Sequence, residues 1–417
     1  MFAEPSNESP SGKMMPGPLA TVPQLAAALA AGRTTSRALV DEALAKIADP
    51  AGEGARTFTA VYDKTARAAA EAQDALRRAG YVASPLAGLP VSLKDLFDVA
   101  GERTLAGSIA LDDQPLAVRD APIVARLRAA GAVLIGRTNM SEFAFSGVGI
   151  NPHYGTPGNP ADRSRIPGGS SSGAGVSAAD GTSVVAIGTD TGGSVRIPAA
   201  LCGIVGFKPT RRRVPVEGAF PLSPTLDSIG PLAGEVASCA IADAVMAGEP
   251  PEVPPAVPLD RLVFGIPQRI VLDNLDPAVA AAFARACRRL EAAGARLTDL
   301  PLKEFDDYGP INAGGGFSPP EAYAAHRALI ARRGADYDQR VRARIERGGS
   351  MSAADYVTLV AQRAAFIARV DAATAAVDGL LLPTVATTAL PIAAFAKDED
   401  FVRLTIYVLR NTAMLPS

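Results

Sequence analysis

The stretch SVVAIGTDTGGSVR, residues 183–196, places an apolar run directly before a glycine-rich turn. The run Ser183–Ile187 has the length and character of a buried strand. After it, Gly192 and Gly193 put two amides without side chains next to the Ser194 hydroxyl. Such amides beside a nucleophile are suited to stabilise an oxyanion. Glycine-rich loops also bind phosphate, but GxxxxGK[ST] and a GxGxxG helix start are both absent, which disfavours that alternative.

Helices and strands alternate on both sides of this stretch. Upstream, a helix is expected from Thr35 or Ser36 toward Ile47, and another between Pro122 and Gly131. Further units are a strand at 132–135, a strand at 262–266, a helix from Asp276-Pro277 to about Gly294, a capping-box helix start at Ser352–Asp355 and a strand at 380–382. The alternation predicts an α/β protein whose strands are buried between helices.

The composition describes a folded, nearly neutral chain. Its 417 residues are 48% hydrophobic and 20% charged, which allows a large core. The net charge of -2 disfavours nucleic acid and anionic membranes as partners. Only two histidines are present, so a histidine-ligated metal site or a serine–histidine pair has few candidates. We therefore expect no metal ion and no other cofactor.

Other features concern compartment and domain organisation. The cysteines Cys202, Cys239 and Cys287 lack CxxC spacing, and we see neither a signal peptide nor an apolar run of about 18 residues. We expect a cytoplasmic protein without a membrane span. Residues 1–18 are rich in Ser, Pro and Gly and predict a disordered leader, and residues 19–417 are expected to form one domain. The segment Pro250–Pro258 either divides this domain into halves or crosses its surface.

Two other segments differ from the alanine-rich background. Leu89–Asp95 ends an apolar run on Lys94, and Pro167–Gly173 reads Pro-Gly-Gly-Ser-Ser-Ser-Gly. A lysine in such a place is usually a solvated charge at a strand edge, and Gly-Ser runs are usually plain turns. Taken alone, neither segment indicates a catalytic function.

Together with Gly188–Arg196, these segments resemble the amidase signature enzymes. The resemblance spans nearly all of the chain from about residue 20 and includes the supporting stretches Gly136–Phe143, Asn159-Pro160, Cys202-Gly203, Gly206–Thr210 and Leu226–Pro231. It implies a single α/β domain with a central mixed sheet covered by helices on both faces. In the family the chain runs on for several dozen residues beyond the position of Ser417, so this sequence is expected to lack that segment.

The family uses a Ser-Ser-Lys triad whose middle serine follows a cis peptide bond. By resemblance, Lys94 is the base, Ser170 the middle serine and Ser194 the acylated nucleophile. Ser171 could be mistaken for the middle serine, and Ser172 stands where a glycine is common. A lysine with an ordinary pKa near 10.4 is protonated at neutral pH, so we expect Lys94 to be buried.

The resemblance also assigns residues around the nucleophile. It gives the oxyanion hole to the backbone amides of Thr191, Gly192, Gly193 and Ser194. Asp190 and Arg196 flank this loop, and we expect them to hold it by an ion pair rather than to bind substrate.

Substrate contacts are expected from the segment Phe143-Ala144-Phe145-Ser146 and from Gly169, by register with the family. Two phenylalanines would make this wall apolar, which favours a small or aromatic acyl group over a charged one. Alternatively, both phenylalanines face the core, as alternating apolar residues usually do.

Three other residues are interpreted mainly as structural. His153 is expected to make a loop hydrogen bond, although it could touch substrate, and His326 to lie on a helix surface or pack against it. Cys202 is expected to be an inert buried thiol.

The sequence predicts an enzyme that hydrolyses linear carbon–nitrogen bonds other than peptide bonds. A carboxylic amide would give a carboxylate and ammonia or an amine through an acyl-enzyme on Ser194. One alternative is the glutaminase A subunit of a tRNA-dependent amidotransferase, although residues 208–215 lack the Tyr-Gly-Arg common in such subunits. Another is a non-catalytic truncated paralogue that acts as a binding protein. The expected partner is a small-molecule amide, and a homodimer remains open.

Overall fold

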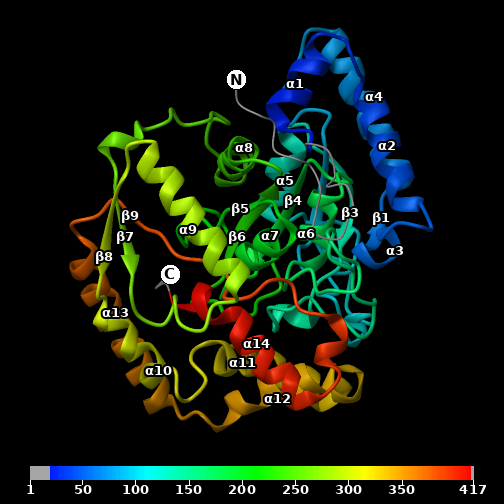
Figure 1. Cartoon of the computed structure of the whole chain (residues 1–417). Helices are drawn as coiled ribbons and strands as arrows, with labels where there is room; N and C mark the ends of the chain where they lie inside the picture. Colours follow the sequence, from blue (N-terminus) through cyan, green and yellow to red (C-terminus); the bar gives the residue numbers. More distant parts are fainter. Residues whose placement is uncertain (1–18, 415–417) are drawn as a thin grey trace.

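The computed structural model describes residues 19–414, so the predicted leader at residues 1–18 lies outside the described part. A six-stranded sheet forms the centre of this part (Figure 1). Its strands are ordered β1-β3-β2-β4-β6-β5. Their bounds are β1 Phe58–Val61, β2 Pro90–Lys94, β3 Val133–Thr138, β4 Val185–Asp190, β5 Val205–Gly206 and β6 Ser228–Ala233. The expected mixed sheet is thus confirmed.

The three middle strands are parallel, and the outer strands are antiparallel to their neighbours. Strand β2 pairs in parallel with both β3 and β4, whereas β1, β6 and β5 pair antiparallel. Lys94 ends β2 and Asp190 ends β4. Because parallel strands end at the same edge of a sheet, these two residues lie at one edge, where open α/β sheets place their sites.

Helices cover both faces, as expected. On one face α2 (Ser36–Ala48) and α4 (Asp63–Arg78) pack on Val133 and Ile135, and α6 (Ser172–Ala179) and α7 (Arg196–Cys202) pack on Ala186 and Leu232. On the other face α1 (Val22–Ala30), α5 (Pro122–Ala129) and α8 (Val236–Ala247) cover the side chains of alternate strand positions such as Val185 and Ile187. The short α3 spans Gly54–Thr57. Because successive side chains of a strand point to opposite faces, the sheet has a hydrophobic core on each face.

A second, three-stranded parallel sheet was not expected as a separate sheet. Its order is β8-β7-β9, with β7 at Val263–Pro267, β8 at Arg296–Leu300 and β9 at Gly379–Leu380. Helix α9 (Pro277–Ala292) connects β7 to β8. The predicted strand at 262–266 is confirmed as β7, whereas the one predicted at 380–382 is shorter and begins earlier, sharing only Leu380 with β9. These two strands pair with each other and not with the central sheet. Residues 250–258 lie between α8 and this sheet.

The remaining helices lie below and to the left of the central sheet in Figure 1. They are α10 (Tyr308–Ile311), α11 (Ser318–Arg333), α12 (Gln339–Glu346), α13 (Ala353–Thr374) and α14 (Asp398–Ala413). The C-terminal end of α14 returns to the loop after β4, where the Thr412 hydroxyl donates to the Gly192 carbonyl at 2.6 Å. Chain segments more than 200 residues apart thus meet beside the predicted nucleophile.

Local signals mark several helix starts correctly. The Thr35 side chain caps α2, the Asp276 side chain caps α9, and Ser352 with Asp355 forms the predicted capping box of α13. No helix in residues 19–414 is long and apolar enough to cross a membrane.

Candidate active site

Lys94 is brought to the site by the alternation of side chains along β2. The Ser92 hydroxyl lies 3.3 Å from that of Ser177 on α6, so Lys94, two residues later, points to the same face. The lysine is fully buried, and its Nζ donates to the Ser170 hydroxyl at 2.7 Å and to the Thr189 hydroxyl at 2.8 Å. The expectation that Lys94 is buried is confirmed.

This environment sets the proton affinity of Lys94. Burial lowers the pKa of Lys94 to about 7, and the negative charges of Asp227 and Asp190 oppose that fall. A substantial fraction of the lysine is therefore uncharged near neutral pH. An uncharged amine can accept a proton, whereas an ordinary surface lysine cannot.

Ser170 is the first residue of the three-serine run. The Gly169–Ser170 peptide bond is cis. A Cβ on Gly169 would lie 2.5 Å from the Gly149 nitrogen, so a larger residue does not fit there. The run turns directly into α6, and all three serines are fully buried. The contact with Lys94 thus belongs to the serine that follows the cis bond.

The neighbouring serines have other partners. The Ser171 hydroxyl donates to the Thr189 carbonyl at 3.3 Å, and its amide donates to the Ser194 carbonyl, also at 3.3 Å. The Ser172 hydroxyl donates to the Asn139 carbonyl. Both serines therefore bind backbone, whereas Ser170 binds the lysine. This arrangement supports the register inferred from the sequence.

The loop after β4 is organised around the Asp190 carboxylate. This group accepts hydrogen bonds from the amides of Gly193 (2.8 Å), Val195 (3.1 Å) and Arg196 (3.3 Å). It also pairs with the Arg196 guanidinium through Nε at 3.0 Å and Nη2 at 2.9 Å. Burial raises the pKa of Asp190, but Arg196 and the amides outweigh burial and hold that pKa below its usual value. The predicted ion pair is confirmed.

The four amides expected to form the oxyanion hole differ in their hydrogen-bond partners. Because the Gly193 amide already donates to Asp190, it does not face a substrate oxygen in this conformation. Within residues 19–414, no acceptor takes the amides of Thr191, Gly192 and Ser194. Gly193 is needed for its conformation, with φ at 135° and a hypothetical Cβ only 2.2 Å from the Thr412 hydroxyl oxygen.

Asp227 is a site residue that the sequence interpretation did not single out. Its carboxylate accepts from the Thr191 hydroxyl at 2.5 Å and from the Leu222 and Ser223 amides at 3.0 Å. Burial raises the pKa of Asp227 to about 6, and those hydrogen bonds and Lys94 act in the opposite direction. The stretch Leu226–Pro231 matched the family, but no local signal indicates that it folds back onto Lys94.

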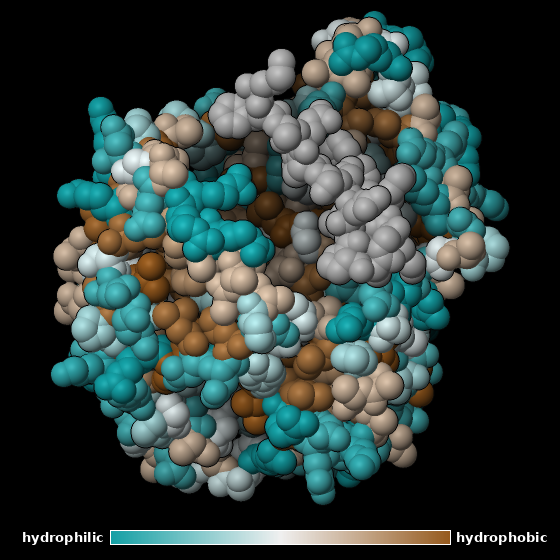
Figure 2. Space-filling model, in the orientation of Figure 1, coloured by the Kyte–Doolittle hydropathy of each residue, from teal (hydrophilic) through white to brown (hydrophobic). Residues whose placement is uncertain are grey.

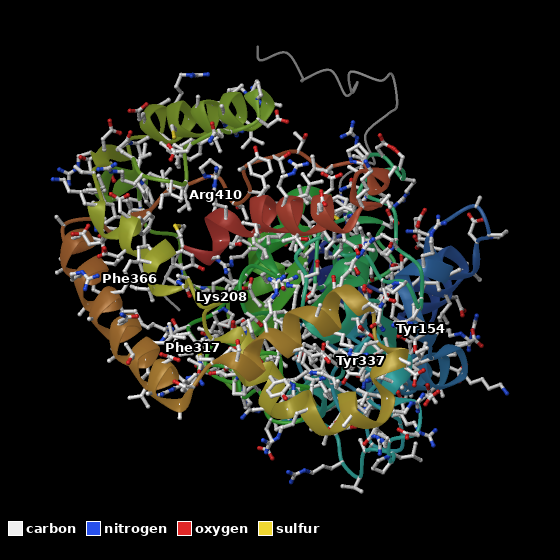
Figure 3. The ribbon with its side chains drawn as sticks, turned by 90° about the horizontal axis from the view of Figure 1, so that it is seen from below. Tyr154, Lys208, Phe317, Tyr337, Phe366 and Arg410 are labelled. Atoms are coloured by element: carbon white, nitrogen blue, oxygen red, sulfur yellow. The ribbon has the colours of Figure 1, made fainter. Side chains whose placement is uncertain are left out.

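A cavity of about 710 Å³ opens beside the nucleophile loop. Thr191 and Gly192 line it together with Phe145, residues 308–309 and 311–319, and the C-terminal end of α14. In Figure 3 the labelled Phe317, Phe366 and Arg410 come from separate segments around it. The face in Figure 2 is hydrophilic along its outer rim, whereas apolar side chains gather toward the centre. The cavity is large enough for a small-molecule substrate.

The residues expected to contact substrate differ in their relation to this cavity. Phe145 lines the cavity, but Phe143 does not. The Phe143 ring is 1% exposed and packs against Phe220, His326 and Tyr337. Ala144, Ser146 and Gly169 are also buried and are not among the residues that line the cavity. Positive φ values of 51° at Phe143 and 58° at Ala144 break the strand-like alternation and turn the two phenylalanines apart.

The remaining candidates are structural. His153 Nε2 lies 2.8 Å from the Glu142 carboxylate, which is the expected loop hydrogen bond. His326 is buried in α11 and packs edge-on against Phe143, and burial lowers its pKa to about 4. The Cys202 thiol donates to the Pro167 carbonyl, and burial raises its pKa. No group of three or more His, Cys, Asp or Glu side chains is suited to hold a metal ion in residues 19–414.

Comparison with known proteins identifies the family. The sequence pattern of the amidase family matches residues 38–416. The chain belongs to the amidase family. It is 39% identical to 2-amino-5-chloromuconic acid deaminase of Comamonas testosteroni over 84% of this chain and 76% of that protein.

Two other related proteins align with a larger share of this amidase. It is 35% identical to the A subunit of the glutamyl-tRNA(Gln) amidotransferase of Roseiflexus sp. (strain RS-1), over 93% of this chain and 85% of that one. A crystal structure described as an amidase superposes with a TM-score of 0.84 at 34% identity, over 94% of this chain and 90% of the other. The chain is therefore an enzyme that hydrolyses amides.

Proposed function

We propose that this amidase cleaves its substrate through an acyl-enzyme on Ser194, with Ser170 and Lys94 carrying the proton. The observation that carries the proposal is the buried contact of 2.7 Å between Lys94 Nζ and the Ser170 hydroxyl. A buried lysine whose pKa is about 7 and whose amine contacts a serine hydroxyl can act as a base at neutral pH.

In the first step, uncharged Lys94 accepts the Ser170 proton while Ser170 accepts that of Ser194. The Ser194 oxygen attacks the amide carbonyl, and the carbonyl oxygen becomes negatively charged. The amides of Thr191, Gly192 and Ser194 are the available donors for that oxygen. The proton then returns through Ser170 to the leaving nitrogen, the carbon–nitrogen bond breaks, and an ester to Ser194 remains.

In the second step, water replaces the amine. The same relay removes a proton from water, which attacks the Ser194 ester and releases the carboxylate. Asp190 and Arg196 contribute by holding the nucleophile loop, and Asp227 by orienting the Thr191 hydroxyl. The reaction consumes one water for each amide and needs no cofactor.

Acylation of Ser194 tests this proposal directly. A fluorophosphonate probe should add to Ser194, as located by mass spectrometry, and Lys94→Ala should slow the labelling strongly. Release of ammonia or an amine from amides should be lost in the same variant. Labelling at another serine, or labelling unaffected by Lys94→Ala, would contradict the assignment, whereas no labelling at all would favour the binding-protein alternative.

The glutaminase role remains a second candidate because the amidotransferase relative aligns over 93% of this chain. Against it, residues 208–215 lack the Tyr-Gly-Arg expected for such glutaminases. Ammonia release from glutamine that requires a partner protein would support this candidate. Hydrolysis of simple amides by the isolated chain would support the stand-alone enzyme.

We also propose a cytoplasmic location and a small-molecule amide as the partner. The three cysteines are all free, as suits a reducing compartment. A homodimer would appear as a doubled mass in light scattering.

A further inference from the structure

The charge of the cavity beside the nucleophile loop differs from that of the whole chain. Five arginines line it, namely Arg196, Arg344, Arg347, Arg363 and Arg410, and no Asp or Glu is among the described lining residues. The chain as a whole is nearly neutral, so this concentration of one sign is local. A positive cavity with low-dielectric walls attracts an anion.

Not all of these arginines are equally available. Arg196 pairs with Asp190, and Arg363 stacks on Phe317 with 5.7 Å between its Cζ and the ring centroid. Arg344 and Arg410 have no carboxylate within ion-pair distance in residues 19–414. Arg347, which also lines the cavity, has no such partner either, so three guanidinium groups there lack a counter-ion from the described chain.

Arg344 projects from α12 to the wall formed by Phe145. Its Nη1 donates to the Phe145 carbonyl at 2.6 Å, and its Cζ lies 4.6 Å from the centroid of the Phe145 ring. These contacts fix the guanidinium plane while leaving other N–H groups unused. Burial lowers the pKa of Arg344 to about 10, with a smaller effect of Arg347 in the same direction. The group is still charged at neutral pH.

Arg410 reaches the cavity from α14, on which it is labelled in Figure 3. Its Nε donates to the Asn411 side chain at 3.1 Å. Its Nη2 is buried and has no hydrogen-bond partner in the described chain. A buried donor without a partner is costly, and a bound anion would satisfy it.

We propose that Arg344 and Arg410 bind a carboxylate carried by the substrate, so that this amidase prefers monoamides of dicarboxylic acids over neutral amides. The inference rests on the proposed amide hydrolysis. Guanidinium groups pair with carboxylates through two parallel hydrogen bonds. The apolar lining, including Leu226, Ile270 and Phe366, suits the short hydrocarbon chain that separates the carboxylate from the amide. This reverses the expectation from the sequence that a charged acyl group fits poorly.

Two substrates of similar length test the proposal: glutaramic acid, which is anionic, and 5-hydroxypentanamide, which is neutral. We expect kcat/KM to be at least tenfold higher for the anionic amide. Arg344→Gln and Arg410→Gln should each lower kcat/KM for glutaramic acid about 10- to 100-fold and change that for the neutral amide less than about threefold. Arg344→Lys and Arg410→Lys should restore part of the preference.

Matched controls separate binding from folding. Arg342 also lies on α12 but pairs with Glu346, and Arg403 lies on α14 and pairs with Asp400; neither lines the cavity. Arg342→Gln and Arg403→Gln should leave the anionic preference unchanged. Equal use of both amides by the wild type, or equal losses on both in the cavity variants, would overturn the proposal.

A binding measurement tests the subsite independently of catalysis. Glutarate should bind the Ser194→Ala variant in calorimetry, and adding Arg344→Gln or Arg410→Gln should weaken that binding by a similar factor. If glutarate binds through both arginines but no amide is hydrolysed, the proposed function fails and the anion subsite stands. If neutral amides are hydrolysed and glutarate does not bind, the subsite fails alone.

Discussion

The Nζ of Lys94 lies 2.7 Å from the Oγ of Ser170, and both residues are completely buried. The contact joins the end of β2 to the turn before α6, which are 76 residues apart in the chain. Since burial lowers the pKa of Lys94 to about 7, a part of the lysine is uncharged at neutral pH and available as a base beside Ser170. The rest of the proposed mechanism depends on this relationship.

Removing the triad residues should affect activity in a definite order. Lys94→Ala and Ser194→Ala should abolish amide hydrolysis, because one removes the base and the other the nucleophile. Ser170→Ala should lower kcat by about 10²- to 10⁴-fold, as is typical for a proton-transfer group. Steady-state release of ammonia measures all three.

Ser171→Ala is the matched control for Ser170→Ala. Its hydroxyl donates to the Thr189 carbonyl and not to Lys94, so kcat should fall less than about tenfold. Circular dichroism verifies that each variant is folded. A harmless Ser170→Ala together with a crippling Ser171→Ala would shift the triad by one residue.

The pH dependence of kcat/KM should show an acidic limb near pH 7. Lys94 acts as a base only when it is uncharged, and it is uncharged above its pKa of about 7. Activity should therefore rise tenfold for each pH unit below that value and level off above it. A limb near pH 4 to 5 with none near 7 would instead point to a carboxylate base.

Asp227→Asn should move this limb to lower pH. The negative charge of Asp227 raises the pKa of Lys94, so its removal should lower that pKa. The amide of asparagine can still accept the hydrogen bond from Thr191, which keeps the loop in place. A shift toward higher pH, measured in the same profile, would contradict the electrostatic coupling.

Lys94→Met should stabilise the fold most at low pH. The pKa of Lys94 falls from 10.5 to about 7 on folding, so below pH 7 the folded state must hold a buried charge. That penalty is on the order of 4–5 kcal/mol below pH 7 and disappears as the pH rises to about 10.5. Lost hydrogen bonds to Ser170 and Thr189 offset a part of the gain. The difference in Tm between variant and wild type should be larger at pH 6 than at pH 9, and a difference independent of pH would refute this.

Asp190→Ala should disorganise the nucleophile loop. It removes the acceptor of the Gly193, Val195 and Arg196 amides and leaves the Arg196 guanidinium without its partner. Loss of one member of a buried pair costs about 3–5 kcal/mol, so denaturant unfolding should show a clear loss of stability. Labelling of Ser194 by a fluorophosphonate should slow in parallel. Arg119→Ala, which breaks a solvent-exposed pair with Glu217, should cost about 1 kcal/mol or less.

The residues of the proposed triad could be named from the sequence because they lie in short motifs that resemble those of the family. Two of these motifs are Gly-Gly-Ser runs, one before α6 and one after β4. Only glycine fits at positions 169 and 193, so the residue type itself indicates the backbone conformation. The same local logic marks the caps at Thr35, Asp276 and Ser352. These interactions join residues that are close in the chain, so they can be predicted from the sequence.

The cavity depends on contacts between distant segments, which no local pattern contains. Phe143 and Phe145 are two residues apart and chemically identical, yet positive φ values in this segment bury one in an aromatic cluster and leave the other at the cavity. Asp227 approaches Lys94 only because β6 pairs with β4. Arg344 and Arg410 line one cavity only because α12 lies against Phe145 and α14 returns to the nucleophile loop. Amide hydrolysis can therefore be inferred from the sequence motifs. The charge of the cavity cannot, because only the long-range packing of helices and loops determines which side chains line it.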